Sequence, residues 1–325
     1  MNSKKTIQEI LSKKTIHNVF FVACGGSLTD LYNGYYFLQC ESASIRSFWM
    51  NANEFLHATP KAFGDTSLVI VCSHSGGTAE SVKAAQFAYD EGAAVITMTF
   101  KKGSKIDKDL PGYYSWIYDW GDDVPTREKP EGKVLELLNE LLQQTDPNYA
   151  LYDAMDESLT KMDDILKSAK DKVQNAAWLF AEAHHDTPML YILGSGAAFS
   201  QAYAMAICSL MEMQWMHCCY LHSGEYFHGP FEVTDGKTPY VLMKSAGKTR
   251  ALDERAEVFL KKYAGEGNTE VIDAMELGLE DLDPSVAEYF NCSLFYKMAC
   301  TYRDALDYPR RHPLSMRRYM GVVEY

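Results

Sequence analysis

Short apolar runs separated by amphipathic segments make up the first half of the chain. The apolar runs predict strands at Val19–Ala23, Ile45–Trp49, Ser67–Cys72, Ala93–Thr99 and Ser115–Trp120. Helices are expected between them, from Gly25 to about Cys40, from Asn53, and from Thr78 to Glu91, where Gly92 is a stop signal. Strands that alternate with helices of this length predict an α/β fold with a doubly wound parallel sheet.

The same alternation returns in the second half of the chain. An acidic, Pro- and Gly-containing segment at 121–133 predicts a connecting loop, and a helical stretch follows from Val134 through His185. Further strands are expected at Pro188–Leu193, His217–Leu221, Tyr240–Lys244 and Thr269–Asp273, with helices at Ala197–Met213 and Ala251–Tyr263. We therefore predict two tandem α/β domains, residues 1–150 and 151–325.

Composition limits the class of partner. With 47% hydrophobic and 23% charged residues, the chain resembles an ordinary soluble globular protein. Its net charge of −13 disfavours nucleic acid or an anionic membrane as a partner. No apolar run approaches the roughly 20 residues that a membrane span needs, and Met1 to Lys14 lacks the apolar core of a signal peptide. The eight cysteines lie mostly in apolar segments, as reduced thiols do, so we expect a cytoplasmic protein.

The most distinctive polar segment follows the predicted strand Ser67–Cys72 directly. It reads Ser73-His74-Ser75-Gly76-Gly77-Thr78 and leads into the next helix. Free N–H groups at a helix start attract anions, and small residues let an oxyanion approach the backbone. Helix capping is the alternative for any one Ser or Thr, but a single cap needs only one hydroxyl. The segment therefore predicts a phosphate site.

Two other strand–glycine–helix junctions accompany this segment. Ser27 follows Cys24-Gly25-Gly26 at the neighbouring strand end, where α/β sheets bind their ligands, although a helix cap explains Ser27 alone equally well. The second junction reads Leu193-Gly194-Ser195-Gly196. None of these segments is a nucleotide P-loop, because no Gly-Lys-Ser/Thr follows the glycines, and the G-x-G-x-x-G fingerprint is absent.

Three residues in the second half are candidates for acid–base chemistry. Glu212 lies near the end of a strongly apolar helix, where partial desolvation would raise the pKa of its carboxyl toward that of a useful base. A position on the solvent side of the helix is the alternative. His228 lies in the turn Gly224-Glu225-Tyr226-Phe227-His228-Gly229-Pro230, and Glu225 competes with Glu212 as the carboxylate.

A zinc site is the other chemistry considered for this region. His217, Cys218, Cys219 and His222 are close in sequence. Alternation along a strand would send them to opposite faces, and the spacing of a zinc motif is missing. We therefore expect no metal ion.

Together these residues identify the chain as similar to a known family. Cys24-Gly25-Gly26-Ser27, the segment Ser73–Thr78 and the tandem organisation resemble the sugar isomerase (SIS) double-domain proteins, which include the isomerase half of glucosamine-6-phosphate synthase. The resemblance covers essentially the whole chain. The usual loop reads Ser-Gln-Ser-Gly-x-Thr, and here His74 replaces the glutamine and Gly77 the acidic residue. The resemblance implies substrate-binding roles for Gly26, Ser27, Ser73, His74, Ser75 and Thr78.

The resemblance also selects the carboxylate. The family's base precedes the histidine of its Gly-x-x-x-His-Gly-Pro turn by sixteen residues, which corresponds to Glu212 here. In these enzymes the histidine opens the sugar ring and comes from the other subunit of a homodimer, so His228 is implied in that role. The family's C-terminal tail closes over the active site with a lysine. The matching tail, Pro313 to Tyr325, carries Arg317 and Arg318 instead, and Arg318 is implied as an electrostatic contact to substrate.

More narrowly, the segment 222–232 and the Arg317-Arg318-Tyr319-Met320 tail resemble the fructosamine-6-phosphate deglycases. These enzymes release an amino acid from 6-phosphorylated fructose–amino-acid adducts. One base and one acid cover every proton transfer, so the resemblance implies no cofactor. The alternatives are a simple aldose–ketose phosphosugar isomerase with the same Glu–His pair and a non-catalytic sugar-phosphate sensor. Because the chain begins Met1-Asn2-Ser3, without the cysteine of a glutaminase half, we do not expect it to make ammonia from glutamine.

Overall fold

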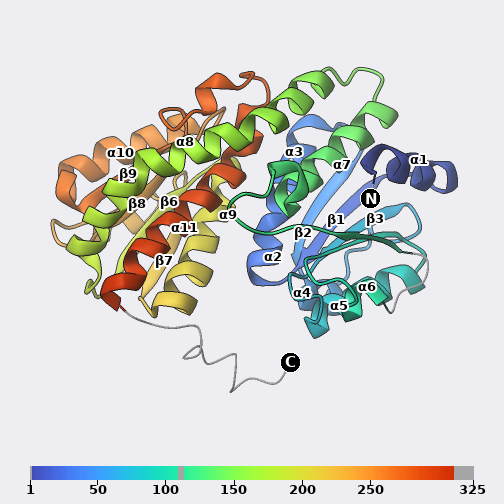
Figure 1. Cartoon of the computed structure of the whole chain (residues 1–325), viewed down its shortest axis with the longest axis horizontal. Helices are drawn as coiled ribbons and strands as arrows, with labels where there is room; N and C mark the ends of the chain where they lie inside the picture. Colours follow the sequence, from blue (N-terminus) through green and yellow to red (C-terminus); the bar gives the residue numbers. More distant parts are fainter. Residues whose placement is uncertain (1, 109–112, 311–325) are drawn as a thin grey trace. The chain divides into compact units, whose positions relative to one another are not determined.

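The computed structural model describes residues 2–108 and 113–310 and divides the chain into two compact units. The first unit extends to Thr160 and the second begins at Lys161 (Figure 1). The division falls within a long helix, α8 (Tyr152–His184). Each unit contains its own parallel sheet, so each is described by itself.

The first unit is built on a five-stranded parallel sheet of order β2-β1-β3-β4-β5. Its strands are β1 (Asn18–Ala23), β2 (Arg46–Asn51), β3 (Ser67–Cys72), β4 (Ala94–Thr99) and β5 (Tyr114–Ile117). The three central strands are buried along their whole length, as expected where helices cover both faces of a sheet. The strand order reverses between β1 and β3, and this reversal opens the ligand-binding crevice of such sheets at the carboxyl ends of the two strands.

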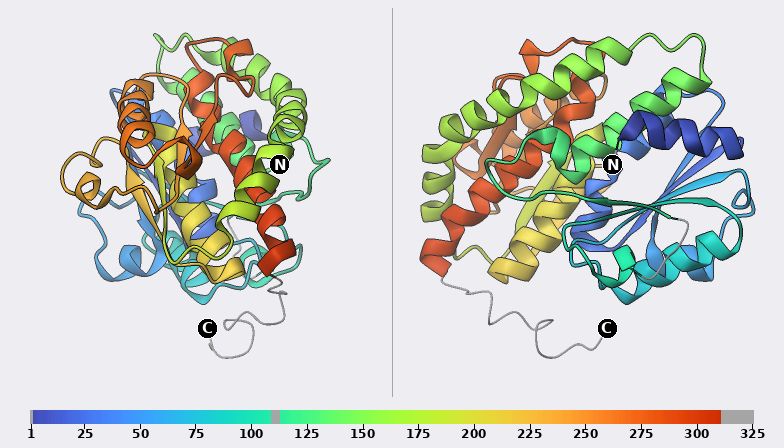
Figure 2. Two further views of the ribbon diagram at one scale, coloured as in Figure 1. Left: turned by 90° about the vertical axis from the view of Figure 1, so that its left-hand side faces the viewer. Right: turned by 45° about the vertical axis from the view of Figure 1, so that its right-hand side comes forward.

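Helices lie on both faces of this sheet (Figure 2, right). One face carries α1 (Ser3–Lys13), α3 (Tyr32–Glu41) and α7 (Pro130–Thr145), and the other carries α4 (Ala52–His57), α5 (Ala79–Asp90) and α6 (Lys105–Lys108). The short helix α2 (Gly25–Asp30) follows β1 directly. Alternation along the strands accounts for the two cores, because Phe20 and Val22 of β1 pack with Ala84 and Ala85 of α5 and with Phe55 of α4.

The second unit repeats this topology. Its four-stranded parallel sheet has the order β7-β6-β8-β9, which matches the β2-β1-β3-β4 part of the first sheet. The strands are β6 (Leu190–Gly194), β7 (Cys218–His222), β8 (Tyr240–Lys244) and β9 (Thr269–Asp273). Besides most of α8, its helices include α9 (Phe199–Ala204), the π-helix η3 (Met205–Glu212), α10 (Arg250–Tyr263) and α11 (Asn291–Arg310). The predicted pair of doubly wound parallel sheets is therefore confirmed.

Two predicted helical segments differ in detail from the prediction. The helical stretch from Val134 through His185 is interrupted between α7 and α8, because Asp146 precedes Pro147 and takes an extended conformation. The segment Ala197–Met213 is helical, as predicted, but it winds as a 3₁₀-turn, then α9, then the π-helix η3. The C-terminal tail, Pro313 to Tyr325, lies outside the described residues.

Within residues 2–108 and 113–310, every helix is too short or too polar to cross a bilayer.

Candidate active site

The loops that follow β1 and β3 are joined by a hydrogen bond. The backbone N–H of His74 donates to Ser27 Oγ at 3.1 Å. The two strands are neighbours in the sheet, with Val22 opposite Val71, so their loops start side by side. We call the segments 24–27 and 73–78 the cradle. It lies at the strand-order reversal, where this class of sheet binds ligands.

Hydroxyl groups in the cradle bond to one another and leave the start of α5 without a side-chain cap. Ser73 Oγ donates to Thr78 Oγ1 at 3.0 Å, and the Gly77 N–H donates to Ser75 Oγ at 3.2 Å. Thr78 occupies the N-cap position of α5 but makes no capping hydrogen bond. Capping therefore does not explain Thr78, and the first N–H groups of α5 remain available to an anion.

Gly76 fixes the shape of the cradle. Its φ of +64° lies in the left-handed region, and a Cβ built there would be 1.9 Å from Ser104 Oγ. The Gly76 N–H donates to the Ser73 carbonyl at 2.9 Å, and its own carbonyl accepts from the Ile106 N–H at 3.0 Å. A side chain at this position would displace the loop that carries the hydroxyls.

Aromatic side chains pack against His74, which keeps an exposed surface. Its ring stacks on Phe100, with centroids 5.2 Å apart and an interplanar angle of 3°, and meets Trp120 edge-on at 4.9 Å. Its Nδ1 lies 3.0 Å from the hydroxyl of Tyr118, a fully buried residue just beyond β5. Partial desolvation by these rings lowers the pKa of His74, which favours the neutral imidazole. This aromatic cluster could not be predicted from the sequence, because Tyr118 and Trp120 fall in the predicted strand Ser115–Trp120, whereas β5 ends at Ile117.

Two buried carboxyl groups lie in the same unit. Asp30 ends α2, and Glu131 is in the first turn of α7. Burial, and then the charge of Glu131, raise the pKa of Asp30 well above its usual range, and burial raises the pKa of Glu131. Both shifts favour the neutral acid, so this pair carries less negative charge than two exposed carboxylates would.

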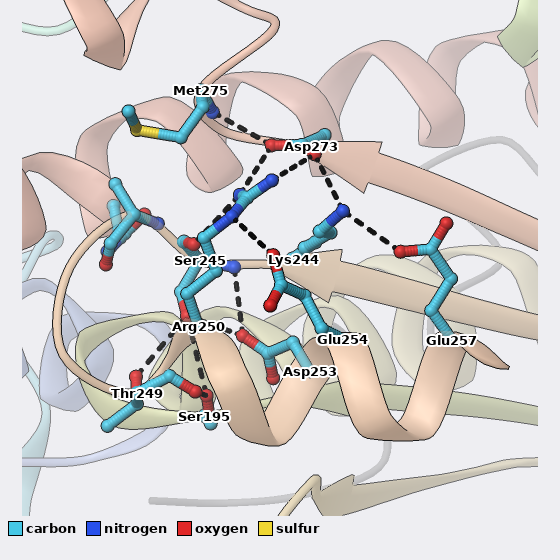
Figure 3. Close-up of polar contacts among 12 residues, drawn as sticks. Ser195, Lys244, Ser245, Thr249, Arg250, Asp253, Glu254, Glu257, Asp273 and Met275 are labelled. Atoms are coloured by element: carbon cyan, nitrogen blue, oxygen red, sulfur yellow. Dashed lines mark hydrogen bonds and ion pairs between the residues drawn. The ribbon is translucent and has the colours of Figure 1, made fainter. Parts of the chain in front are cut away.

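The corresponding junction in the second unit is occupied by the protein's own groups (Figure 3). The junction consists of the loops 194–196 and 245–249, after β6 and β8. Asp253, which is fully buried, accepts hydrogen bonds from Ser245 Oγ and from the Ser245 N–H, the latter at 2.9 Å. The next N–H, of Ala246, donates to Asn291 Oδ1 at 2.9 Å. The first two N–H groups of this loop are thus taken by side chains of the protein itself, which favours the first unit as the phosphate site.

An ion-pair network beside this junction holds β8, β9 and α10 together (Figure 3). Arg250 contacts both carboxylate oxygens of Asp273 at 2.7 Å, and Lys244 lies 3.1 Å from Asp273 and 3.0 Å from Glu257. Burial alone would raise the pKa of Asp273, but its bonds to Arg250 and Lys244 outweigh that effect and lower it below the usual value. The network is structural, because its charges are satisfied by one another.

Glu212 is the last residue of the π-helix η3 and is half-buried. The i→i+5 winding changes the side of the helix on which Glu212 lies, and π-segments are frequent at functional sites. The chain then turns sharply, since Trp215 has a φ of +53°. Gln214, fully buried, donates to Asp307 of α11, and Arg310 Nε donates to the Gln214 carbonyl at 2.7 Å. These contacts fix the end of the helix that carries the predicted base.

His228 is exposed, and it lies on a turn whose preceding residues are well packed. Tyr226 is fully buried and bonds to Thr234, and Phe227 packs edge-on against Phe259 of α10 at 5.5 Å. The His228 N–H donates to the Glu225 carbonyl at 2.9 Å, while its ring makes no hydrogen bond to any described residue. The turn therefore presents an unengaged imidazole at the surface of this unit.

The structure thus groups the predicted site residues within each unit. Six lie together in the cradle of the first unit: Gly26, Ser27, Ser73, His74, Ser75 and Thr78. The two predicted catalytic residues, Glu212 and His228, belong to the second unit. Arg318 lies outside the described residues, as does Arg317. No three His, Cys, Asp or Glu side chains within 2–108 and 113–310 are arranged to hold a metal ion.

Solved structures of known proteins define the class. The chain superposes with a TM-score of 0.94 on a protein from Salmonella typhimurium LT2 that is provisionally called a phosphosugar isomerase, covering 100% of this chain and 96% of that one at 41% identity. A Bacillus subtilis protein with the same provisional name gives 0.93 at 40% identity, covering 99% and 97%. The C-terminal domain of the glucosamine-fructose-6-phosphate aminotransferase of Francisella tularensis shares the fold, with a TM-score of 0.68 at 19% identity. This is the double SIS fold of the phosphosugar isomerases.

Sequence comparison narrows the class to one family. The chain is 42% identical over 315 residues to the fructosamine deglycase FrlB of Bacillus subtilis strain 168, covering 97% of this chain and 94% of that protein. It is 26% identical over 333 residues to the fructoselysine 6-phosphate deglycase of Escherichia coli K12, covering 98% and 90%. No family model matches the chain. The chain belongs to the fructosamine deglycase family, and it is a deglycase enzyme.

Proposed function

We propose that this enzyme hydrolyses 6-phosphorylated fructose–amino-acid adducts to glucose 6-phosphate and a free amino acid. The observation that carries the proposal is the 42% identity to a fructosamine deglycase over 97% of the chain. The uncapped helix start and the hydroxyl groups of the cradle support the 6-phosphate as part of the substrate. The net charge of −13 provides no general attraction for an anion, so the phosphate has to be recognised locally.

In this proposal the first unit binds the phosphate group of the substrate. Ser27, Ser73, Ser75 and Thr78 would exchange their bonds within the cradle for bonds to phosphate oxygens, together with the first N–H groups of α5. Gly26 would allow the oxyanion to approach the backbone. Hydrogen bonds to a charged oxygen are stronger than the hydroxyl–hydroxyl bonds that they replace.

In this proposal the second unit supplies the two residues that transfer protons. His228 opens the furanose ring by moving a proton between the C2 hydroxyl and the ring oxygen, which frees the C2 carbonyl. Glu212 removes a proton from C1, which is acidic beside that carbonyl, and an enaminol forms. Protonation at C2 then gives an aldimine between C1 and the amine nitrogen. Water adds at C1, the C–N bond breaks, and glucose 6-phosphate and the amino acid leave.

We also propose that the working form is a homodimer in which His228 serves the site of the other subunit, and that Arg318 contacts the substrate. The exposed, unengaged ring of His228 on its anchored turn supports the first part of this proposal. All eight cysteines are free thiols, which supports a reducing compartment such as the cytoplasm.

The test of the reaction is a turnover panel of fructose-lysine, -aspartate, -asparagine and -glycine 6-phosphates, with glucose 6-phosphate and amino acid both measured. Release of the two products in equal amounts from at least one adduct is expected. If the enzyme interconverts aldose and ketose phosphates but releases no amine, it is an isomerase and the proposal is wrong. Binding without turnover of any of these compounds would identify a sensor instead.

The shared site has its own test. Inactive Glu212→Gln and His228→Asn homodimers are mixed and allowed to exchange subunits, with exchange confirmed by mass. One of the two sites in each mixed dimer would hold both native groups, so activity should return. Unrestored activity after complete exchange would place both groups in the same chain.

A further inference from the structure

Nearly every polar atom of His74 makes a hydrogen bond. Its N–H donates to Ser27, and its carbonyl accepts from Thr99 Oγ1 at 3.2 Å and from the Phe100 N–H at 3.3 Å. Its ring stacks on Phe100, and its Nδ1 lies 3.0 Å from the hydroxyl of Tyr118. Only Nε2 makes no hydrogen bond to any residue that the structure describes. A side chain fixed in this way has one nitrogen left for a ligand.

The direction of the bond between Tyr118 and His74 decides what Nε2 can do. A neutral imidazole carries one proton, so if Nδ1 accepts a proton from Tyr118, Nε2 must be the donor. If Nδ1 donated instead, Nε2 would present a lone pair and would repel a phosphate oxygen. The tautomer of His74 is therefore a condition for phosphate binding.

The surroundings of Tyr118 favour donation to His74. Burial raises the pKa of the Tyr118 phenol far above its usual value, so the hydroxyl keeps its proton. Burial also raises the pKa of Cys72, which hydrogen-bonds to Tyr118 as a neutral thiol, and that of Asp30, which favours the neutral acid. A thiol is a weak hydrogen-bond acceptor, and a protonated carboxyl group accepts less strongly than a carboxylate. The Nδ1 of His74 is therefore the best acceptor for the Tyr118 hydroxyl.

We propose that Tyr118 is a positioning residue of the cradle: by donating its hydroxyl proton to Nδ1, it holds His74 in the tautomer whose Nε2–H donates to an oxygen of the substrate phosphate. The proposal rests on the proposed function, in which the cradle binds the 6-phosphate. It accounts for a histidine at a position where the resembling loop has glutamine, because glutamine carries its own N–H donors and needs no second residue to fix them.

The first test reads the tautomer directly. Nitrogen-15 NMR of the ligand-free wild-type enzyme at neutral pH, with His74 assigned by comparison with His74→Gln, should show the proton on Nε2 and an accepting Nδ1. A proton on Nδ1 would overturn the proposal. This measurement needs no activity and no variant of Tyr118.

The second test is kinetic. Tyr118→Phe removes the hydroxyl, and with it the bond to His74 and the weaker one to Cys72. It should raise KM about 3- to 10-fold with kcat nearly unchanged, as expected for a bond made in both ground and transition states. Tyr113→Phe is the matched control, because Tyr113 also loses one hydrogen bond, to the Ala85 carbonyl at 2.7 Å, but does not contact His74. The control should leave KM as it is.

A double-mutant cycle separates positioning from general support of the fold. In a His74→Gln background, Tyr118→Phe should have no further effect on KM, because the amide supplies its donor without help. An equal rise in KM in both backgrounds would mean that Tyr118 acts on the structure and not through His74. That result would overturn the proposal.

A third measurement keeps this inference distinct from the proposed function. Inorganic phosphate or glucose 6-phosphate is titrated into labelled wild-type enzyme while the His74 signals are followed. A shift of the Nε2 signal on saturation is expected. An Nε2–H tautomer that neither ligand perturbs would show that phosphate binds elsewhere, and the site assignment would fail together with this role of His74. A perturbed Nδ1–H tautomer would refute only the role of Tyr118.

Discussion

Replacing Gly76 by alanine tests whether the shape of the cradle is as tightly determined as the structure indicates. The substitution adds one methyl group at a φ of +64°. The new Cβ would lie 1.9 Å from Ser104 Oγ, 2.4 Å from Ser104 Cβ and 2.8 Å from Thr99 Oγ1. All three distances are too short for non-bonded atoms, so either the loop or its neighbours must move.

The expected cost has two parts. A non-glycine residue in the left-handed region costs about 1–2 kcal/mol. Forcing a methyl group into a packed position costs about 1–3 kcal/mol more. Gly76→Ala should therefore destabilise the first unit by about 2–5 kcal/mol, unless the loop relieves the overlap by moving, in which case KM for the phosphosugar should rise instead.

Three further variants separate these parts. Gly92 has a φ of +84° with no atom within 4 Å of a built Cβ, so Gly92→Ala should show the backbone cost alone. For Gly77 the nearest atom is Ser75 Oγ at 3.8 Å, so Gly77→Ala should be nearly neutral. Adding Ser104→Gly to Gly76→Ala removes the two closest overlaps but leaves the one with Thr99 Oγ1, so it should recover most of the packing part and none of the backbone part.

The assay is urea denaturation followed by circular dichroism, with KM measured on the same preparations. We expect Gly76→Ala to be impaired most in stability or in KM, Gly92→Ala to be intermediate in stability, and Gly77→Ala to resemble the wild type. A Gly76→Ala enzyme with wild-type stability and wild-type KM would refute this expectation, because the methyl group would then have found room that the structure does not contain.

The remaining predictions concern the proposed site and the second unit. Ser73→Ala combined with Ser75→Ala should raise KM far more than it lowers kcat, since each lost bond to a phosphate oxygen is worth about 1.5–3 kcal/mol, and an unchanged KM would place the phosphate elsewhere. Glu212→Gln should lower kcat by about 10²–10⁴-fold, whereas Glu225→Gln serves as the control and should cost much less. Asp273→Asn should destabilise the enzyme in urea at neutral pH. Because the folded-state pKa of Asp273 is lowered, its ion pairs stabilise the wild type above the unfolded pKa, and this stability is lost as pH falls through the folded pKa, so the two proteins should converge in acid.

The fold could be predicted from the sequence because its strands are short, apolar and separated by helices. β3, β8 and β9 begin and end at the predicted residues, since each is a β-rich run bounded by polar residues. The π-helix could not be predicted, because the apolar residues of Met205–Glu212 fit an α-helix equally well. The i→i+5 winding depends on packing against the rest of the unit.

The cradle was predictable only in part. Its hydroxyls and glycines are contiguous in sequence, so Ser73 to Thr78 could be recognised as a unit. The contacts of His74 come from the ends of β4 and β5, far along the chain, and no local pattern links them to it. Likewise, nothing in the sequence showed that Asp253 fills the junction in the second unit, because its partner Ser245 resembles the cradle serines.

The filled junction of the second unit has a thermodynamic consequence. The side chain of Asp253 is tethered to the chain, so the second unit keeps this internal acceptor at any concentration of solute, whereas the cradle, in its proposed role, would draw its anion from solution. A ligand that binds only the folded cradle at 100 times its Kd would add about 2.7 kcal/mol to the stability of the first unit and nothing intrinsic to the second. Phosphosugar would then make one half of the enzyme more resistant to heat and proteolysis when substrate is abundant, and the two halves would melt apart or together according to the supply of substrate.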